Sequence, residues 1–171
     1  DESLGPRLNL TLFGNVEWVG GNGIQINAGG RAQATTASSK KLADQIRTTG
    51  EFSVEMWVAP ANVTQEGPAR IMTYSSGSSE RNFTVGQTLY SYDFMTRTSA
   101  NNGNGEPALT TSDEDEDLQA TLQHVVMTYS PVAGRRVYVN GAYTDDADPS
   151  AAGNLNGWDD GFAFMLGSES S

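Results

Sequence analysis

"FSVEMWV" at residues 52–58 and "HVVMTYS" at residues 124–130 decide the fold, because both stretches alternate between apolar and other side chains. In the first, every second residue from Phe52 to Val58 is apolar, and in the second the same alternation begins at Val125. A period of two residues is typical of a strand with one buried face. Each stretch therefore predicts a half-buried β-strand.

Further strands are expected on both sides of these two. "RRVYVNGAYT" at residues 135–144 predicts a hairpin, since Asn140-Gly141 suits a two-residue type I′ turn between strands. The remaining candidates are "LNLTLFG" (8–14), "GIQIN" (23–27), "ARIMTYS" (69–75), "FTVGQ" (83–87), "YSYDFMTRT" (90–98) and "GFAFMLG" (161–167). Many short strands bounded by turn residues predict two packed antiparallel sheets.

One segment, "SSKKLADQIRTTG" at residues 38–50, predicts a helix. Leu42 and Ile46 lie one turn apart, Ser39 is the expected N-cap, and Gly50 is the expected end. We therefore expect an all-β, two-sheet antiparallel jelly-roll sandwich with one short helix. Residues 1–171 are expected to form a single domain, in which 99–117 are expected to be a long surface loop.

The charge of the chain limits its partners. The net charge is −11, and the chain contains no cysteine and no apolar run long enough to span a membrane. An acidic surface repels phosphate, which argues against nucleic acid and anionic membranes as partners. The lack of cysteine excludes a disulfide framework, thiol catalysis and thiolate metal sites.

Several stretches together resemble one family. These are "GEFSVEMWVAPANVTQEGPARIMTYSSGSSERNFTVGQ", "RTSANNGNGEPAL", "LQHVVMTYSPVAGRRVYVNG" and "GNLNGWDDGFAFMLGSE". They are similar to the laminin-G-like (concanavalin A-like) jelly-roll domains of bacterial surface and exported proteins. The resemblance implies two curved sheets, an extracellular or cell-surface location, and a module that binds a glycan or surface protein without catalysis. Because this fold carries many functions, the implied ligand is loosely defined.

The sequence gives little support for catalysis. Glucanases of this fold use two carboxylates about 5 Å apart on one strand face, whereas Glu55 is the single carboxylate of its stretch. His124 is the single histidine, and no nucleophile motif accompanies it. We expect it to be a hydrogen-bonded residue on the concave face or under a loop. The chain is therefore predicted not to be an enzyme.

A set of aromatic and planar polar residues is the candidate ligand site. Sugars are held by aromatic faces and by amide or guanidinium donors. The candidates are Trp57, Arg81, Asn82, Gln87, Arg97, Tyr138 and Trp158, with Tyr90 and Tyr92 nearby in sequence. The alternative interpretation is structural: Arg81 and Arg97 would lock loops, and Trp57 would fill the space between the sheets.

The acidic run at residues 113–117, and Asp145, Asp146 and Asp148, offer oxygen ligands of the kind that calcium prefers. The run lacks the glycine and glutamate spacing of a hand-type calcium loop. Solvated surface charge is the favoured interpretation. No metal site and no cofactor are predicted.

These features predict a non-catalytic extracellular carbohydrate-binding or adhesion module. The alternative is a structural subunit of a cell-surface or filamentous assembly, held together by strand pairing between chains. The two hypotheses differ in what they expect of the isolated chain: glycan binding for the first, and polymers or a stable heteromer for the second.

The segment "GFAFMLGSESS" at residues 161–171 raises a further expectation. In the domains that this chain resembles, the corresponding strand and turn are followed by another apolar strand, which pairs beside the N-terminal one. We therefore expect that strand to be missing from residues 1–171, leaving a gap inside a sheet. Either the natural protein continues past Ser171, which is the favoured alternative, or a neighbouring chain donates the strand.

Overall fold

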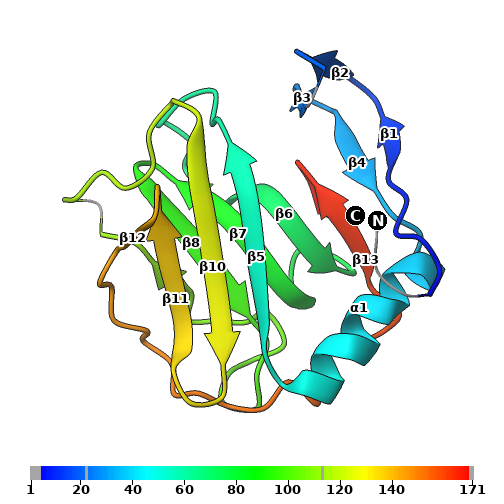
Figure 1. The fold of residues 1–171 in the computed structure, drawn as a ribbon, viewed down its shortest axis with the longest axis vertical. Helices are drawn as coiled ribbons and strands as arrows, with labels where there is room; N and C mark the ends of the chain where they lie inside the picture. Colours follow the sequence, from blue (N-terminus) through cyan, green and yellow to red (C-terminus); the bar gives the residue numbers. More distant parts are fainter. Residues whose placement is uncertain (1–4, 22, 113, 170–171) are drawn as a thin grey trace.

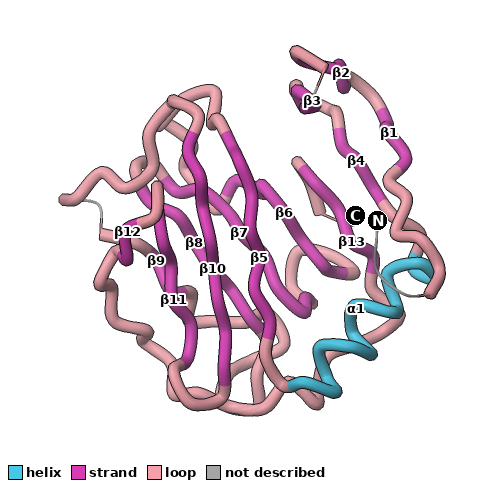
Figure 2. Tube along the Cα trace, viewed as in Figure 1, coloured by secondary structure: helices cyan, strands magenta, loops and turns pink. Residues whose placement is uncertain are grey.

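The computed structural model describes residues 5–21, 23–112 and 114–169. Its strands form a seven-stranded sheet in the order β1-β4-β13-β6-β7-β8-β9, a four-stranded sheet in the order β12-β11-β10-β5, and the β2-β3 hairpin. The first two sheets face each other, and helix α1 lies beside them (Figures 1 and 2). This arrangement confirms the predicted all-β sandwich with one helix.

The elements are short and follow one another closely. The strands are β1 (Thr11–Phe13), β2 (Val16–Val19), β3 (Gly23–Ile26), β4 (Arg31–Gln33), β5 (Phe52–Val58), β6 (Ala69–Ser75), β7 (Arg81–Thr88), β8 (Ser91–Thr96), β9 (Leu109–Thr110), β10 (Gln123–Ser130), β11 (Gly134–Val139), β12 (Ala142–Tyr143) and β13 (Ala163–Leu166). The helix is α1 (Thr36–Thr49).

The two stretches that predict the fold lie side by side as β5 and β10. They pair antiparallel from Gln123 opposite Val58 to Tyr129 opposite Phe52. Their alternation places one set of side chains toward the seven-stranded sheet and the other set toward solvent. The pairing is regular over the whole length of β5.

The β11–β12 hairpin has the predicted turn. Asn140 and Gly141 have φ angles of 52° and 85°, which is the left-handed geometry of a type I′ turn. The Asn140 amide also donates to the carbonyl oxygen of His124 at 2.7 Å, which ties the turn to β10. The turn assignment is therefore confirmed.

Helix α1 begins earlier than predicted. Thr35 is the N-cap, and its hydroxyl oxygen accepts from the Ser38 amide at 3.1 Å. Ser39, the predicted cap, is instead buried inside the helix, where its hydroxyl accepts from the Phe164 amide of β13 at 3.0 Å. The prediction for Ser39 was wrong because a hydroxyl one turn earlier satisfies the first free amides. Gly50 ends the helix as predicted, with a φ of 75°.

An aromatic cluster fills the space between the two main sheets. The Trp158 ring lies 5.0 Å from that of Phe52, 6.0 Å from that of Phe83 and 6.1 Å from that of Tyr74, measured between centroids. Its indole N–H donates to the Arg97 carbonyl oxygen at 2.8 Å, so the polar atom of this buried ring is satisfied. This cluster holds a loop, β5 and the seven-stranded sheet together.

One row of side chains crosses the whole inner face of the seven-stranded sheet. In register from β1 to β9, it consists of Leu12, Ala32, Leu166, Met72, Val85, Phe94 and Leu109. Val85, Phe94, Leu109 and the small Ala32 are buried, Met72 and Leu166 are partly exposed, and Leu12 is 36% exposed. For the larger side chains of this row, the cover therefore weakens toward β1.

The reason for this gradient is the width of the second sheet. In Figure 1 the four-stranded sheet lies over β7 and β8, while β6, β13, β4 and β1 lie beyond β5. Helix α1 covers part of this extension, because it packs on β13. The remainder of β13, β4 and β1, away from α1, has no comparable cover from the described elements.

The last strand of the described chain has a partner on each side, since β13 bonds to β4 on one side and β6 on the other. Strand β1 pairs with β4 and lies at the edge of the described sheet. The expected strand beside β1 therefore stays a prediction. Within the described residues, no helix is both long and apolar enough to cross a membrane.

Candidate binding face on the four-stranded sheet

The outer face of the four-stranded sheet carries a group of aromatic and ionisable side chains. His124 lies directly opposite Trp57 in the β5–β10 pairing, and Val126 lies between Glu55 on one side and Tyr138 on the other. Tyr138 in turn faces Tyr143 across the hairpin. We call this surface the outer aromatic face, defined by Glu55, Trp57, His124, Tyr138 and Tyr143.

Contacts between neighbours fix the rings of this face. The Trp57 and His124 rings lie 4.9 Å apart at an interplanar angle of 33°, and the Tyr138 and Tyr143 rings lie 5.3 Å apart. The His124 Nε2 atom is 2.9 Å from Glu55 Oε1. A histidine held on one side by a carboxylate and on the other by an indole keeps one orientation. The face is thus preorganised before any ligand arrives.

Trp57 nevertheless remains in water, with 68% of its surface exposed. A single exposed apolar residue needs no explanation, but a tryptophan surrounded by other rings forms a contiguous patch of the kind used for recognition. Arg136 adds a cation to the same face, with its guanidinium carbon 5.7 Å from the Tyr143 ring centroid. The face thus combines flat apolar surface with hydrogen-bonding groups at its margins.

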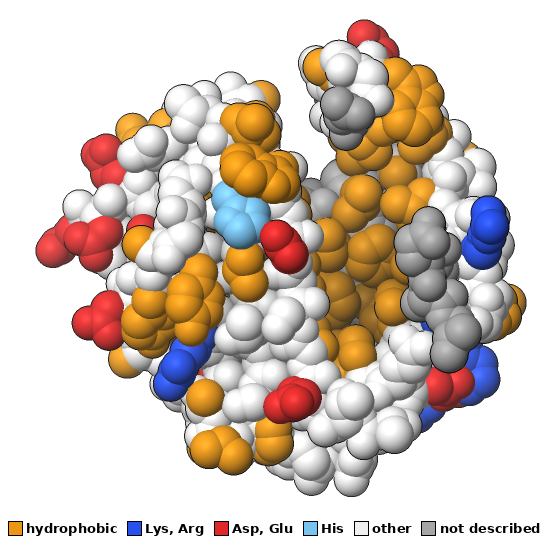
Figure 3. Space-filling model, viewed as in Figure 1, with side chains coloured by type: hydrophobic (Ala, Val, Ile, Leu, Met, Phe, Trp, Pro, Cys, Tyr) orange, Lys and Arg blue, Asp and Glu red, His pale blue; other side chains and the backbone are white. Residues whose placement is uncertain are grey.

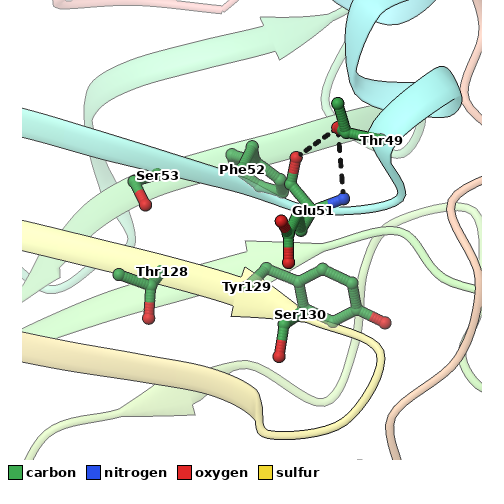
Figure 4. A pocket seen from close by; sticks show the side chains of 7 residues that line it. All are labelled: Thr49, Glu51, Phe52, Ser53, Thr128, Tyr129 and Ser130. Carbon is green, nitrogen blue, oxygen red and sulfur yellow. Dashed lines mark hydrogen bonds between the residues drawn. The ribbon is translucent and has the colours of Figure 1, made fainter.

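A shallow pocket of about 480 Å³ lies at the other end of β5 and β10. It is lined by Thr49, Glu51, Phe52, Ser53, Thr128, Tyr129 and Ser130 (Figure 4). Thr49 at the end of α1 donates from its hydroxyl to the Glu51 carbonyl oxygen at 2.8 Å. Ser53 and Thr128 are direct neighbours across the strands. The pocket is therefore rich in hydroxyl groups and continues the solvent side of the strands that carry Trp57.

The predicted site residues separate into two groups. Trp57 and Tyr138 lie on the outer aromatic face, so the expectation that Trp57 fills the space between the sheets was wrong. The other five have structural contacts. Arg81, Asn82, Gln87 and Trp158 are buried.

The contacts of the buried group are with backbone atoms of loops. Asn82 Nδ2 donates to the Asp159 carbonyl oxygen at 2.7 Å, and its Oδ1 accepts from the Asp159 amide at 2.8 Å. Gln87 Nε2 donates to the Asn62 carbonyl oxygen at 2.6 Å. Arg97 is partly exposed and pairs with Glu80 at 3.3 Å. These side chains hold loops, as the structural interpretation of Arg81 and Arg97 supposes.

Arg81 is deeply buried as well, with 1% of its side chain exposed. One of its terminal nitrogens donates to Thr84 Oγ1 at 3.3 Å, and the other lies 3.8 Å from a carboxylate oxygen of Glu169. Burial, and then the charge of Arg70, lower the pKa of Arg81. Its guanidinium therefore has no surface to offer a ligand in this arrangement.

His124 and Tyr143 are members of the face that were not among the predicted site residues. His124 is hydrogen-bonded, as expected, and lies on the outer side of β10 beside Trp57. The signal for both residues was the pairing register. The type I′ turn fixes Tyr143 opposite Tyr138, and the β5–β10 register fixes His124 opposite Trp57.

The acidic residues do not converge on a metal site in the described part of the chain, where no group of three or more His, Cys, Asp or Glu side chains is arranged to hold an ion. Burial, and then the charges of Asp146 and Asp115, raise the pKa of Asp117. Asp148 pairs with the buried Arg135 at 2.6 Å. Asp113 lies outside the described residues, so the calcium interpretation of its run gains no support.

Comparison with known proteins gives a family and a fold. The sequence model described as the concanavalin A-like lectin/glucanases superfamily matches residues 28–171. No curated protein matches the sequence. Similar folds occur among solved structures of botulinum neurotoxin binding domains.

Three of these illustrate the likeness. The serotype C1 binding domain is 12% identical with a TM-score of 0.66, and the neurotoxin DC binding domain in complex with rat synaptotagmin II is 16% identical, also at 0.66. A type C structure, described as showing cell entry that depends on two ganglioside molecules, is 15% identical at 0.60. They match 93–94% of this chain, which spans only 38–39% of theirs. At this identity the likeness concerns the fold.

Proposed function

Because the chain belongs to the concanavalin A-like lectin/glucanases superfamily, we propose that it is a non-catalytic extracellular module that binds carbohydrate through the outer aromatic face. The observation that carries the proposal is the exposed Trp57 ring, held beside His124 in a fixed orientation. An aromatic ring of this kind offers a flat apolar surface to the C–H side of a sugar.

The groups around Trp57 suit the hydroxyls of such a ligand. The Glu55 carboxylate accepts hydrogen bonds, and His124 keeps a second ring nitrogen beyond the one that faces Glu55. The exposed carboxylates Glu55 and Glu51 disfavour anionic sugars along this strand. The ligand that fits best is a neutral glycan with one ring stacked on Trp57.

The structural neighbours support the proposal by analogy. The neurotoxin structures are binding domains, and their descriptions name a protein partner, synaptotagmin II, and a glycolipid partner, ganglioside. A glycan, or a surface protein that carries one, is the corresponding partner class for this chain. Since one fold carries many functions, the residues of the face decide the ligand.

Catalysis is not part of the proposal. Glu55, the single carboxylate of β5, is hydrogen-bonded to His124 and forms no acid–nucleophile pair with a second carboxylate of its strand. We expect the chain to release no reducing ends from β-glucans, alginate or ulvan. Measurable turnover that Glu55→Gln abolishes would contradict this expectation.

The test is a glycan array followed by titration calorimetry on the best ligand. Trp57→Ala should weaken binding on the order of tenfold or more, because a central tryptophan commonly contributes more than 1 kcal/mol. Trp18→Ala is the matched control, since Trp18 is 76% exposed and lies on the separate β2–β3 hairpin. Equal affinity of the Trp57 variant and the native chain, or no binding to any glycan, would overturn the proposal.

The alternative function, a structural subunit held by strand pairing between chains, depends on a different feature. It is favoured by the edge of the four-stranded sheet at β5, because the side of β5 away from β10 has no strand partner among the described residues. Self-assembly of the purified chain into polymers would support this alternative over glycan binding.

A further inference from the structure

The solvent side of β5 and β10 forms a continuous surface from the Trp57 ring to the pocket at the other end of these strands. Side chains on one face of a strand recur at every second residue, so consecutive steps along this surface are two residues apart. The three steps are the cross-strand pairs Trp57 with His124, Glu55 with Val126, and Ser53 with Thr128. We call this surface the β5–β10 track, defined by these six residues.

The track is longer than a single sugar ring. Trp57 and Ser53 are four residues apart in one strand, which corresponds to about 13 Å at the usual rise of a strand. The pairing of β5 with β10 has no register shift over this length, so the three steps stay in line. A sugar stacked on Trp57 therefore does not reach the pocket, and a ligand that fills both places is a chain of sugars.

The pocket supplies hydrogen-bonding groups at the far end of the track. Its volume of about 480 Å³ is in the range of small-molecule sites. In Figure 4 the hydroxyls of Ser53, Thr128 and Ser130 and the Glu51 carboxylate point to the same side of the strands. Ser130 Oγ accepts from the Ala133 amide at 3.0 Å, whereas the Ser53 and Thr128 hydroxyls bond to no other described residue. These two hydroxyls are therefore available to the hydroxyls of a sugar.

The middle step of the track is lower than the step at Trp57. Val126 lies between Glu55 and Tyr138, and its side chain is smaller than the rings nearby. A second sugar can therefore lay its C–H side on Val126 while its hydroxyls bond to the Glu55 carboxylate. Figure 3 looks onto this face, where hydrophobic side chains gather around the histidine, which is the only one in the chain.

We infer that the ligand is an extended chain of at least three neutral sugars, which runs along the β5–β10 track from Trp57 to the pocket. This inference rests on the carbohydrate function proposed above and names the class of glycan, an oligo- or polysaccharide bound along its length. One ring stacks on Trp57, the next covers Val126, and a third bonds to Ser53 and Thr128 in the pocket. A single sugar at the end of a branched glycan uses the first step alone.

The charges along the track favour neutral sugars over acidic ones. Glu51 and Glu55 are both exposed on β5 and the turn before it, one on each side of Ser53. Their carboxylates accept hydrogen bonds from sugar hydroxyls and repel carboxylated or sulfated sugars. Arg136 lies opposite Thr128 on β11, but its guanidinium is held over the Tyr143 ring.

The track is independent of whatever lies beside β5 in the sheet. It uses side chains that face solvent from two strands already paired with each other, and no backbone group at the edge of β5. Its distinguishing property is a dependence of affinity on chain length. Stacking on Trp57 alone predicts equal affinity for one sugar and for many.

The test is titration calorimetry of the full chain with cello-, laminari-, manno- and xylo-oligosaccharides of one to six sugars. In the series that binds, affinity should rise on the order of tenfold or more from one sugar to three or four, and then level off. Oligogalacturonates of the same lengths should bind more weakly, because their carboxylates meet Glu51 and Glu55.

Two variants separate the pocket from the tryptophan. Ser53→Ile fills the floor of the pocket with an apolar side chain that suits a strand. It should reduce the affinity of a tetrasaccharide to that of a disaccharide and leave the disaccharide unchanged, whereas Trp57→Ala should weaken both. Gln25→Ile, at an exposed position of β3, is the matched control. If Ser53→Ile does not fold, Thr128→Val removes a hydroxyl of the same step and should weaken only the longer ligands.

The outcomes distinguish this inference from the function on which it rests. Affinity that does not change with chain length, or that Ser53→Ile and Thr128→Val lower equally for all lengths, would overturn the track and leave glycan binding at Trp57 in place. Tighter binding of oligogalacturonates would overturn the neutral class of ligand. No binding in any series would overturn both proposals.

Discussion

The two ends of the seven-stranded sheet contrast in how well one row of side chains is covered. At the β7–β9 end, Val85, Phe94 and Leu109 are buried beneath the four-stranded sheet. At the β1–β13 end, Leu12 and Leu166 continue the row in register but remain partly exposed. The strands at the two ends have the same kind of side chain facing inward.

The contrast shows that alternation along a strand determines which side faces inward, and the opposite layer determines how far that side is buried. The stabilisation of an apolar side chain follows the surface it loses to packing. The covered end should therefore supply most of the stability.

The largest expected effect compares two truncations within the row. Phe94→Ala should destabilise the chain by about 3–5 kcal/mol, because it leaves a cavity in a filled core. Leu12→Ala should cost less than about 1 kcal/mol, because Leu12 is already exposed. Urea denaturation measures both changes. Equal costs would show that the open end is as well packed as the covered end.

The second prediction concerns the ion pair at the covered end. Arg135 is buried, donates to the Phe94 carbonyl oxygen at 2.8 Å and pairs with Asp148. Asp148→Ala should cost about 3 kcal/mol, since it leaves a buried charge without its partner. Leu12→Ala serves again as the reference for the open end.

The same pair gives a pH dependence. Burial alone would raise the pKa of Asp148, but hydrogen bonds from Arg135 and Ser150 outweigh it and hold the pKa below its usual 3.8. The ionised form is thus favoured in the folded chain, and its contribution is lost as the pH falls below about 3.8. Acid titration of stability should be shallower in Asp148→Ala. An identical acid profile would contradict the assignment.

The third prediction tests the short β12 edge, which contrasts with the long β5 edge. Gly141 has a φ of 85°, and a Cβ atom there would meet nothing within 4 Å. Gly141→Val should therefore cost about 1–2 kcal/mol from backbone strain alone. Ala142→Val is the control, because it adds the same side chain one residue later in β12. An unchanged melting temperature for Gly141→Val would argue against the turn geometry.

The smallest expected effect concerns Asp117, a partly buried carboxylate in the segment that precedes β10. Because burial and neighbouring carboxylates raise the pKa of Asp117, its ionised form destabilises the folded chain at neutral pH. Asp117→Asn should raise the melting temperature slightly at pH 7. The gain should vanish below about pH 3.8, where Asp117 is protonated in both states. Glu116→Gln, at an exposed neighbour, should show no such gain.

The sequence predicts most of the strands, the hairpin and the location of the helix because these depend on local patterns. It misses the short strands β2, β4 and β9, and β9 lies within residues 99–117, which were expected to be a loop. β5, β10 and the Asn140-Gly141 turn are examples, since alternation and turn residues act within a few positions. The end of the helix at Gly50 follows in the same way. Ser39 was wrong as the cap because a competing hydroxyl lies only one turn away.

The site was harder to predict because it depends on burial from both sides. β7 and β8 are buried on both faces, so Asn82 is enclosed although it lies on the opposite side of β7 from the core residues Phe83 and Val85. Alternation suggests a solvent-facing side for such a residue, and only the packed structure reveals the loop that covers it. The pairing of Trp57 with His124 likewise depends on a register between distant segments.

The most direct test of the contrast is hydrogen exchange of the chain alone, followed amide by amide by NMR. If β5 is an open edge, its amides that face away from β10 should exchange quickly, while their neighbours that bond to β10 exchange slowly. β10, which has a partner on each side, should be protected throughout. Uniform slow exchange along the whole of β5 in a monomeric sample would contradict the account, because it would mean that the edge is already covered.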